Sequence, residues 1–197
     1  MKSIRLREGK ERSLLKRHPW VFAGSVDRGG GDSGETVRVE SSDGRFLAWA
    51  AYSARSQIRL RVWSFDEAER IDAAFFERRI ASAVAMRARL GIRSDGVRLI
   101  HGEADGLPGL IVDRYAETLV AQFLSAGSER WKATIADALL AATGCERLYE
   151  RSDSGVRKLE GLVAVTGWLR GEGDTGVTIR EHDWRLTLDV HEGHKTG

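Results

Sequence analysis

The sequence contains a single cysteine, only two prolines and no long hydrophobic run. One cysteine, Cys145, excludes an intrachain disulfide and a metal cluster built from several cysteines. No apolar run approaches the ~18 residues of a membrane-spanning helix. The chain is charged from Lys2 onward and shows no apolar signal-peptide segment. We therefore expect a cytoplasmic protein that does not enter a membrane.

Net charge is also small, at +2 over 197 residues, but it is unevenly distributed. Residues 1–65 carry 13 Lys and Arg against 7 Asp and Glu, whereas residues 66–197 carry 18 against 22. A basic part beside an acidic one suggests that the first part meets a polyanion, although the same surplus suits a domain that is merely soluble. The hydrophobic content of 42% is sufficient for a folded core.

Short strand patterns dominate residues 1–65. Apolar and polar residues alternate in several segments, of which Ile58–Phe65 is the last, and one short helix is predicted over Lys10–Arg17. His18-Pro19 ends that helix, because the residue before a proline is pushed out of the helical region. We expect a connecting loop over the glycine-rich segment Asp27–Gly34. Several short strands in ~65 residues predict a small β-barrel, whose closure hides the strand edges.

A basic face follows the later strands of this predicted barrel. No acidic residue lies between positions 43 and 66, whereas four arginines do: Arg45, Arg55, Arg59 and Arg61. Together with Trp63, such a face is typical of a surface that binds the backbone and bases of RNA. A solvated strand face above a core tryptophan would give the same pattern, so both interpretations stay open at this point.

Residues 70–175 predict a smaller domain of mixed helices and strands. The clearest helix spans Ile71–Leu90 and ends at Gly91, and a second helix is expected to begin at Ser128 and end at Gly144. We expect Cys145, just past that end, to be a small buried hydrophobic residue rather than a reactive thiol. Residues 167–176 are expected to be a glycine-rich connection, followed by a hairpin over residues 177–190.

The stretch RLIHGEADGLPGLIVDRY, residues 98–115, contains two strand patterns around a turn. Its acids Glu103, Asp105 and Asp113 suit turn chemistry and pairing with Arg98 and Arg114. The alternative is a pair of carboxylates for acid–base catalysis, or oxygen ligands for a divalent metal.

Four stretches together resemble a known family. GKERSLLKRHPWVFAGSV (9–26) and AAYSARSQIRLRVWSFD (50–66) resemble the PUA domain of bacterial class I SAM-dependent methyltransferases that modify cytosine C5 in 23S ribosomal RNA. The 98–115 stretch and YERSDSGVRKLEGL (149–162) resemble the middle domain of the same family. The resemblance covers nearly the whole chain but only about the first half of a family member.

The resemblance implies roles for particular residues. It gives an RNA-facing role to the predicted helix, its exit and the turn at Arg55, which together with the basic strand face yields the candidate RNA-binding residues Lys10, Arg12, Lys16, Arg17, His18, Arg55, Arg59 and Arg61. It places the tail His194, Lys195, Thr196 and Gly197 at the edge of the pocket for S-adenosylmethionine (SAM). The family's nucleophilic cysteine lies beyond residue 197, so no catalytic residue is expected here. His191 and His194 lack a third placed ligand, and no metal site is expected.

We therefore expect an α+β protein with a PUA-like RNA-binding barrel (1–69), a middle α+β domain (70–175), and a hairpin that begins a truncated methyltransferase domain (176–197). The Rossmann-like domain that binds SAM is expected to be absent. The predicted function is the RNA-docking part of a SAM-dependent ribosomal RNA (cytosine-5) methyltransferase, itself inactive and binding no cofactor alone. The alternatives are a stand-alone RNA-binding or ribosome-assembly module, and another RNA-modifying enzyme that shares only the PUA domain. Ribosomal RNA is the expected partner, and a homodimer is compatible with the sequence.

Overall fold

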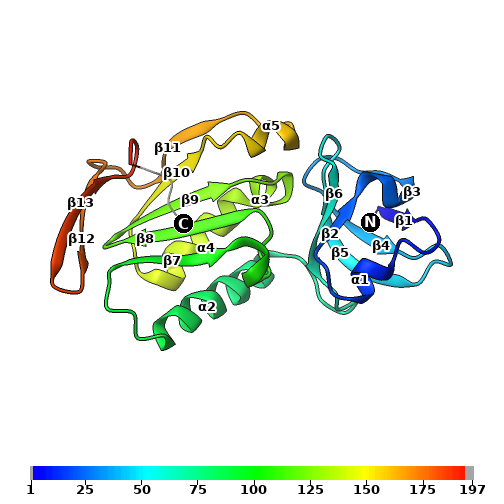
Figure 1. The fold of residues 1–197 in the computed structure, drawn as a ribbon, viewed down its shortest axis with the longest axis horizontal. Coiled ribbons are helices and arrows are strands. Elements are labelled where there is room, and N and C mark those ends of the chain that lie inside the picture. Colours follow the sequence, from blue (N-terminus) through cyan, green and yellow to red (C-terminus); the bar gives the residue numbers. More distant parts are fainter. Residues whose placement is uncertain (1, 194–197) are drawn as a thin grey trace.

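A computed structural model describes residues 2–193 and contains a six-stranded sheet, a five-stranded sheet with helices, and a two-stranded hairpin (Figure 1). The six-stranded sheet is formed by β1 (Ser3–Leu6), β2 (Trp20–Phe22), β3 (Val26–Gly29), β4 (Thr36–Glu40), β5 (Phe46–Tyr52) and β6 (Ile58–Ser64). The short helices α1 (Arg12–Leu15) and η1 (Ala23–Ser25) lie in its connections.

The six-stranded sheet has the order β2-β6-β5-β4-β1-β3, with β1 and β4 parallel and every other pair antiparallel. Its apolar core includes Ile4, Val39 and Leu60, and Leu14 anchors α1 to it. Over the described residues its hydrogen bonding is open, with β2 and β3 as edge strands, so it lacks the closed ladder of the predicted barrel. The loop expected over Asp27–Gly34 is partly strand, because β3 pairs with β1 through Gly29.

The five-stranded sheet has the order β11-β10-β9-β8-β7. Its strands are β7 (Gly96–His101), β8 (Leu110–Tyr115), β9 (Thr118–Phe123), β10 (Arg147–Ser152) and β11 (Val165–Arg170). The helical segments around it are α2 (Ala73–Arg89), η2 (Gly102–Asp105), α3 (Ala126–Arg130), α4 (Lys132–Thr143) and α5 (Val156–Glu160). The hairpin pairs β12 (Gly176–Glu181) with β13 (Trp184–Asp189).

The prediction of an α+β protein is wrong. Strands β9 and β10 pair in parallel, and α3 and α4 form the crossover between them. The chain therefore contains a βαβ unit within a mixed sheet, and the structure is a mixed α/β fold. Turn residues mark where a segment ends, but they do not show which strand the next segment pairs with. The sequence therefore did not reveal that β10 pairs in parallel with β9.

The helices begin and end close to the predicted positions except at Ser128, and the second predicted helix is divided at Trp131 into α3 and α4. The side chain of Asp72 caps α2 by accepting from the backbone N–H of Phe75, and Gly144 ends α4 in the left-handed region. The exception is Ser128, which lies inside α3; Ser125 is the capping residue, and the two serines form a reciprocal capping box. The expected loop over residues 167–176 is also wrong in its first half, because β11 continues through Gly167 to Arg170.

The two sheets share one apolar cluster. Ala51 and Trp63 of the first sheet pack with the core formed by α2, α4 and the five-stranded sheet. The Trp63 ring meets the Phe76 ring edge-on, with centroids 5.3 Å apart. Helix α3 seats closely on β5, since a Cβ added to Gly127 would lie 2.4 Å from the Cβ of Ala51. The junction is therefore a packed interface and not a flexible hinge.

The β12–β13 hairpin packs on the face of the five-stranded sheet opposite α2 and α4. Val120 and Tyr149 of the sheet meet Val177, Ile179 and Val190 of the hairpin segment. The hairpin forms one end of the molecule, far from the six-stranded sheet (Figure 1). None of the helices described is long and apolar enough to cross a membrane.

Candidate RNA-binding surface and domain junction

Helix α1 and the residues directly beside it carry a group of exposed cations. Leu14 faces the core and is only 2% exposed, whereas Lys10, Arg12 and Lys16 lie on the solvent side of the same short segment. None of these three forms an ion pair with any residue between 2 and 193. Unpaired lysines and arginines on one face are what a protein uses to neutralise the phosphates of a nucleic acid. We call Lys10, Arg12 and Lys16 the α1 cations.

Two residues at the exit of α1 have defined conformations. Arg17 adopts a left-handed backbone with φ of 62°, and its guanidinium carbon lies 4.9 Å from the centroid of the Phe65 ring. A left-handed backbone is rare for arginine, and here the backbone N–H of Arg17 donates to the carbonyl of Leu14 at 2.8 Å, which holds the turn. The Nδ1 atom of exposed His18 accepts a 3.1 Å hydrogen bond from the backbone N–H of Trp20. This contact fixes the exit of α1 before β2.

Arg55 and Arg59 lie around the turn between β5 and β6. The Nη1 atom of half-buried Arg59 donates to the carbonyl of Ser53 at 3.1 Å and also to that of Ala54. Arg59 therefore holds the turn together. Arg55 is exposed, and its side chain lies against Gly161, because a Cβ added to that glycine would lie 2.5 Å from Cδ of Arg55.

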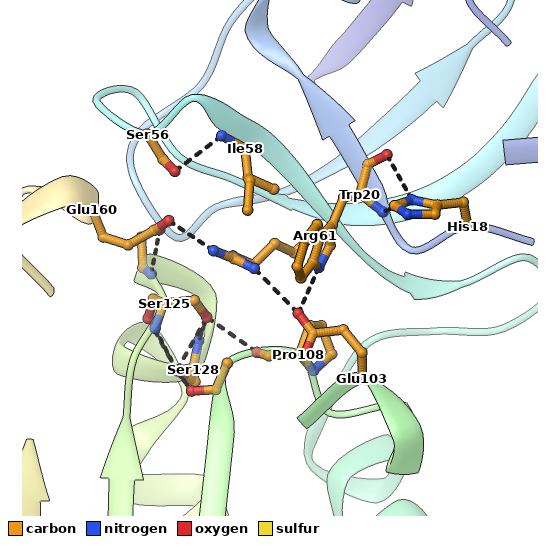
Figure 2. A network of polar contacts seen from close by, with 12 residues as sticks. His18, Trp20, Ser56, Ile58, Arg61, Glu103, Pro108, Ser125, Ser128 and Glu160 are labelled. Carbon is orange, nitrogen blue, oxygen red and sulfur yellow. Dashed lines mark hydrogen bonds and ion pairs between the residues drawn. The ribbon is translucent and has the colours of Figure 1, made fainter. Parts of the chain in front are cut away.

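Arg61 occupies a different environment from the other candidates. It is 8% exposed and lies between two carboxylates of the second domain (Figure 2). Its Nη1 donates to Oε1 of Glu103 at 3.1 Å, and its Nη2 donates to Oε1 of Glu160 at 3.2 Å. Both partners lie far away in the sequence, 42 and 99 residues later. This placement argues against Arg61 as an RNA contact and makes it part of the domain junction.

Further hydrogen bonds complete the junction. Nε1 of Trp20 donates to Oε1 of Glu103 at 2.6 Å, and the Trp20 ring lies 5.4 Å from the Arg61 guanidinium carbon. The second oxygen of Glu160, which is only 2% exposed, accepts from the backbone N–H of Ala126 at the start of α3. Figure 2 shows these side chains converging from β2, β6, η2 and α5. Sequence reasoning did not identify Trp20 or Glu160, because only the fold brings them to Arg61.

The acids of the 98–115 stretch pair with three different arginines. Asp113 and Arg98 form a bidentate pair at 2.8 and 3.0 Å, which confirms the predicted pairing for these two residues. Asp105 instead pairs with Arg87 of α2, at 2.7 Å between Oδ2 and Nη2, and Glu103 with Arg61. Arg114 bonds Glu117 and the carbonyl of Ala116 rather than any of the three.

Two pKa shifts follow from these pairs. Burial raises the pKa of Asp105, but the hydrogen bonds from the Arg87 side chain and the His101 backbone N–H outweigh it and leave the pKa below its ordinary value. The hydrogen bond to Asp113 raises the pKa of Arg98 above its usual range. Asp105 is therefore held ionised as the partner of an arginine, which is an environment unlike that of a general acid.

A cavity of about 500 Å³ opens beside the junction. Its lining comes from both domains and includes Arg17, Phe65, Glu69, Arg79 and Glu103. Arg79 bonds Glu69 at 3.3 Å, and Arg17 lies over Phe65 as described above. Arg17 therefore links this cavity to the surface that carries the α1 cations.

Two other sequence predictions concern the end of the chain and Cys145. His194, Lys195, Thr196 and Gly197, the predicted cofactor edge, lie outside the described residues. His191 is bound to the Tyr149 hydroxyl at 2.6 Å through Nδ1. No group of three His, Cys, Asp or Glu side chains within residues 2–193 is placed to hold a metal ion. Cys145 is a free thiol and is 4% exposed, as expected of a buried residue.

Comparison with known proteins identifies a known type of domain in the first part of the chain. Residues 4–65 match a family model described as a PUA-like domain. The chain is 48% identical over 201 residues to Ribosomal RNA large subunit methyltransferase I of Shewanella frigidimarina, covering 98% of this chain and 50% of that protein. It is also 48% identical to the protein of the same name from Klebsiella pneumoniae, covering 98% of this chain and 49% of that protein.

Two solved structures share the fold at low sequence identity. One is described as a SAM-dependent methyltransferase from Streptococcus mutans, with a TM-score of 0.78 at 14% identity. The other is described as a methyltransferase complexed with SAH, with a TM-score of 0.79 at 13% identity. They cover 98% of this chain, which in turn covers 50% and 49% of theirs. The chain spans about half the length of the curated relatives it matches, and over that span it carries a PUA-like domain and is similar to ribosomal RNA large subunit methyltransferases.

Proposed function

We propose that this chain is the RNA-docking part of a SAM-dependent methyltransferase that modifies C5 of a cytosine in large-subunit ribosomal RNA. The single observation that carries the proposal is the exposed, unpaired α1 cations within a segment that matches a PUA-like domain. The 48% identity to ribosomal RNA methyltransferases supplies the class of RNA and of reaction.

The RNA-binding surface in this proposal consists of the α1 cations together with Arg17, His18, Arg55 and Arg59. Arg61 is left out, because both of its Nη atoms are occupied by carboxylates. The surface is cationic and can release condensed counterions when it meets phosphates, which makes its affinity depend on salt. Domain boundaries near residues 69 and 175 are part of the same proposal, supported by the ends of β6 and β11.

Methyl transfer in this proposal belongs to a part of the enzyme outside this chain. Transfer to C5 of cytosine uses a cysteine thiolate that adds covalently to the base. Cys145 is 4% exposed and packs in the apolar core of the five-stranded sheet and its helices, so its thiol is poorly placed to attack an RNA base. SAM would likewise be bound by that other part.

The test of RNA docking uses the variant Lys10→Gln/Arg12→Gln/Lys16→Gln on the 197-residue chain. We expect its affinity for a structured large-subunit RNA fragment to fall at least tenfold at low salt. The slope of log K against log salt should become shallower by about 0.7–0.9 for each RNA phosphate that the variant no longer neutralises. Fluorescence anisotropy titrations at several salt concentrations measure both quantities.

The matched control is Arg45→Gln, which removes an exposed cation that is already paired with Asp43 at 2.8 Å. Its RNA affinity should stay within about twofold of that of the unmodified chain. An unchanged affinity and salt slope in the triple variant would refute the α1 surface. Turnover of labelled SAM by the purified chain would refute the assignment of catalysis to another part and leave RNA docking intact.

A further inference from the structure

Three arginines are at least nine-tenths buried in the described chain: Arg61, Arg151 and Arg157. Arg61 meets Glu103 and Glu160, and Arg157 meets Glu129 at 2.7 Å. Arg151, on β10, forms no ion pair with any residue between 2 and 193. Burying a charge without an opposite charge nearby costs desolvation free energy, and a bound anion beside Arg151 would offset that cost.

The hydrogen bonds of Arg151 are also incomplete. Its Nη1 donates to the carbonyl of Gly193, whereas its buried Nε has no hydrogen-bond partner among the described residues. The Nε atom of Arg61 is unpartnered as well, but two carboxylates already balance the charge of that residue. Arg151 therefore combines an unpaired charge with an unpartnered donor, a combination that neither other buried arginine shows.

Arg151 lines a cavity of about 310 Å³ between the five-stranded sheet and the β12–β13 hairpin. Apolar walls come from Val120 of β9 and from Ile179, Leu188 and Val190 of the hairpin segment. The amide of Gln122, on β9, lies on the same lining and is only 9% exposed. The cavity thus offers a guanidinium and a neutral amide inside apolar walls.

Two carboxylates also line this cavity, and both are already bound. Both carboxylate oxygens of Asp113 accept hydrogen bonds from the Arg98 guanidinium. Asp189 accepts from the backbone N–H groups of Glu192 and His191 and from the Thr175 hydroxyl, and the bond from Glu192 contributes most to lowering its pKa. The Asp113 charge is balanced by Arg98, whereas Asp189 is held by neutral donors. Neither carboxylate forms an ion pair with Arg151, so its guanidinium has no direct ionic partner among residues 2–193.

We propose that Arg151 binds a small oxyanion, a phosphate or carboxylate group, in the cavity between the sheet and the hairpin. Guanidinium groups match the planar and tetrahedral oxygens of both anions, and the apolar walls exclude the water that would otherwise weaken the contact. The proposal concerns a site remote from the α1 cations and does not depend on the proposed function.

Inorganic phosphate is the probe for the first experiment, with chloride at equal ionic strength as the reference. Thermal unfolding of the 197-residue chain and of its Arg151→Gln and Arg147→Gln variants is compared. Arg147 is the matched control, because it lies on the same strand and the same face but outside the cavity lining. At ten times its Kd, phosphate should raise Tm by about 3–5 °C in the unmodified chain and in Arg147→Gln. Arg151→Gln should lose that shift.

An equal shift in all three proteins would reveal a general salt effect and would overturn the proposal. Isothermal titration of the unmodified chain with phosphate gives a second measurement that needs no variant. Saturable binding of one phosphate is expected, and the absence of saturable heat would also overturn the proposal.

Competition separates the two sources of the oxyanion. If a large-subunit RNA fragment displaces phosphate and Arg151→Gln weakens RNA binding, the oxyanion is an RNA phosphate. If RNA leaves phosphate bound and binds Arg151→Gln normally, the site takes a free phosphate or carboxylate. Either result upholds an anion site at Arg151.

A comparison of the buried arginines provides a third readout. In buffer without phosphate, Arg151→Gln should leave Tm unchanged or raise it, because it removes an uncompensated charge. Arg157→Gln should lower Tm, because it strips Glu129 and two carbonyls of their donor. A large loss of Tm in Arg151→Gln would show that its charge is already satisfied and would overturn the proposal.

Discussion

Arginines of the first domain occur in two contrasting settings. Those around α1 are exposed to solvent, whereas Arg61 is buried and bound to Glu103 and Glu160 of the second domain. Both kinds belong to the same basic segment and are indistinguishable by composition. The contrast teaches that a positive charge indicates a nucleic-acid contact only where the fold supplies no carboxylate.

The largest effect is expected from breaking the buried setting. Arg61→Gln leaves the carboxylates of Glu103 and Glu160 at the junction without their cation. Removing one partner of a buried ion pair costs roughly 3–5 kcal/mol, and we expect the free energy of unfolding to fall by that amount. Urea unfolding followed by tryptophan fluorescence measures it.

The control for this change is Arg45→Gln, which removes a pair whose side chains are 74% and 57% exposed. It should change the free energy of unfolding by no more than ~0.5 kcal/mol. The contrast drawn above fails if Arg61→Gln is as mild as the control while it abolishes RNA binding.

A second prediction tests how closely the two domains pack. Gly127→Ala places a Cβ 2.4 Å from Cβ of Ala51 and 2.8 Å from Cζ2 of Trp63, so the neighbouring backbone must shift. We expect a loss of about 1–3 kcal/mol in the free energy of unfolding. Gly155→Ala is the control, because nothing lies within 4 Å of its Cβ, and it should be neutral or slightly stabilising. Equal stability of the two variants would mean that the domains are loosely joined.

The third and smallest effect is expected from an ion pair within the second domain, between Asp105 and Arg87. Asp105→Asn weakens the pair with Arg87, and we expect a loss of about 1–2 kcal/mol at pH 7. The pKa of folded Asp105 is lowered, so its contribution to stability is complete above the ordinary carboxyl pKa of about 3.9. It is then lost as the pH falls through the lower folded pKa.

Unfolding free energies of Asp105→Asn and the unmodified chain should therefore converge as the pH falls below about 4. Asp137→Asn, whose side chain is 68% exposed beside Arg170, should show little difference at any pH. A difference for Asp105→Asn that persists unchanged at low pH would contradict the assigned ion pair.

The sequence predicted the features that depend on neighbouring residues. The α2 helix, its glycine stop, the end of α4 at Gly144 and the β12–β13 hairpin agree with the structure because periodicity and turn residues are local signals. Strands β3 and β11 were missed because they contain Gly29 and Gly167, which suggest loops when read without their pairing partners.

Long-range partners account for the remaining errors. The parallel pairing of β9 with β10 contradicts the predicted α+β class, and no residue in either strand indicates which strand it pairs with. The alternation along β6 correctly placed Arg59 and Arg61 on the side of the strand opposite the apolar core of the six-stranded sheet. That side is not open to solvent at Arg61, because Glu103 and Glu160 bind its guanidinium there. The roles of Arg55, Arg59 and the α1 cations remain predictions that RNA binding will decide.

The position of Arg61 in the sequence also determines when its ion pair with Glu160 can form during synthesis of the chain. Arg61 leaves the ribosome 99 residues ahead of Glu160, which at ~5–20 residues per second is a delay of roughly 5–20 s. During that interval the guanidinium is hydrated beside an incomplete second domain. The six-stranded sheet has its own apolar core and does not need α5 to bury it, whereas the junction is complete only when α5 has emerged.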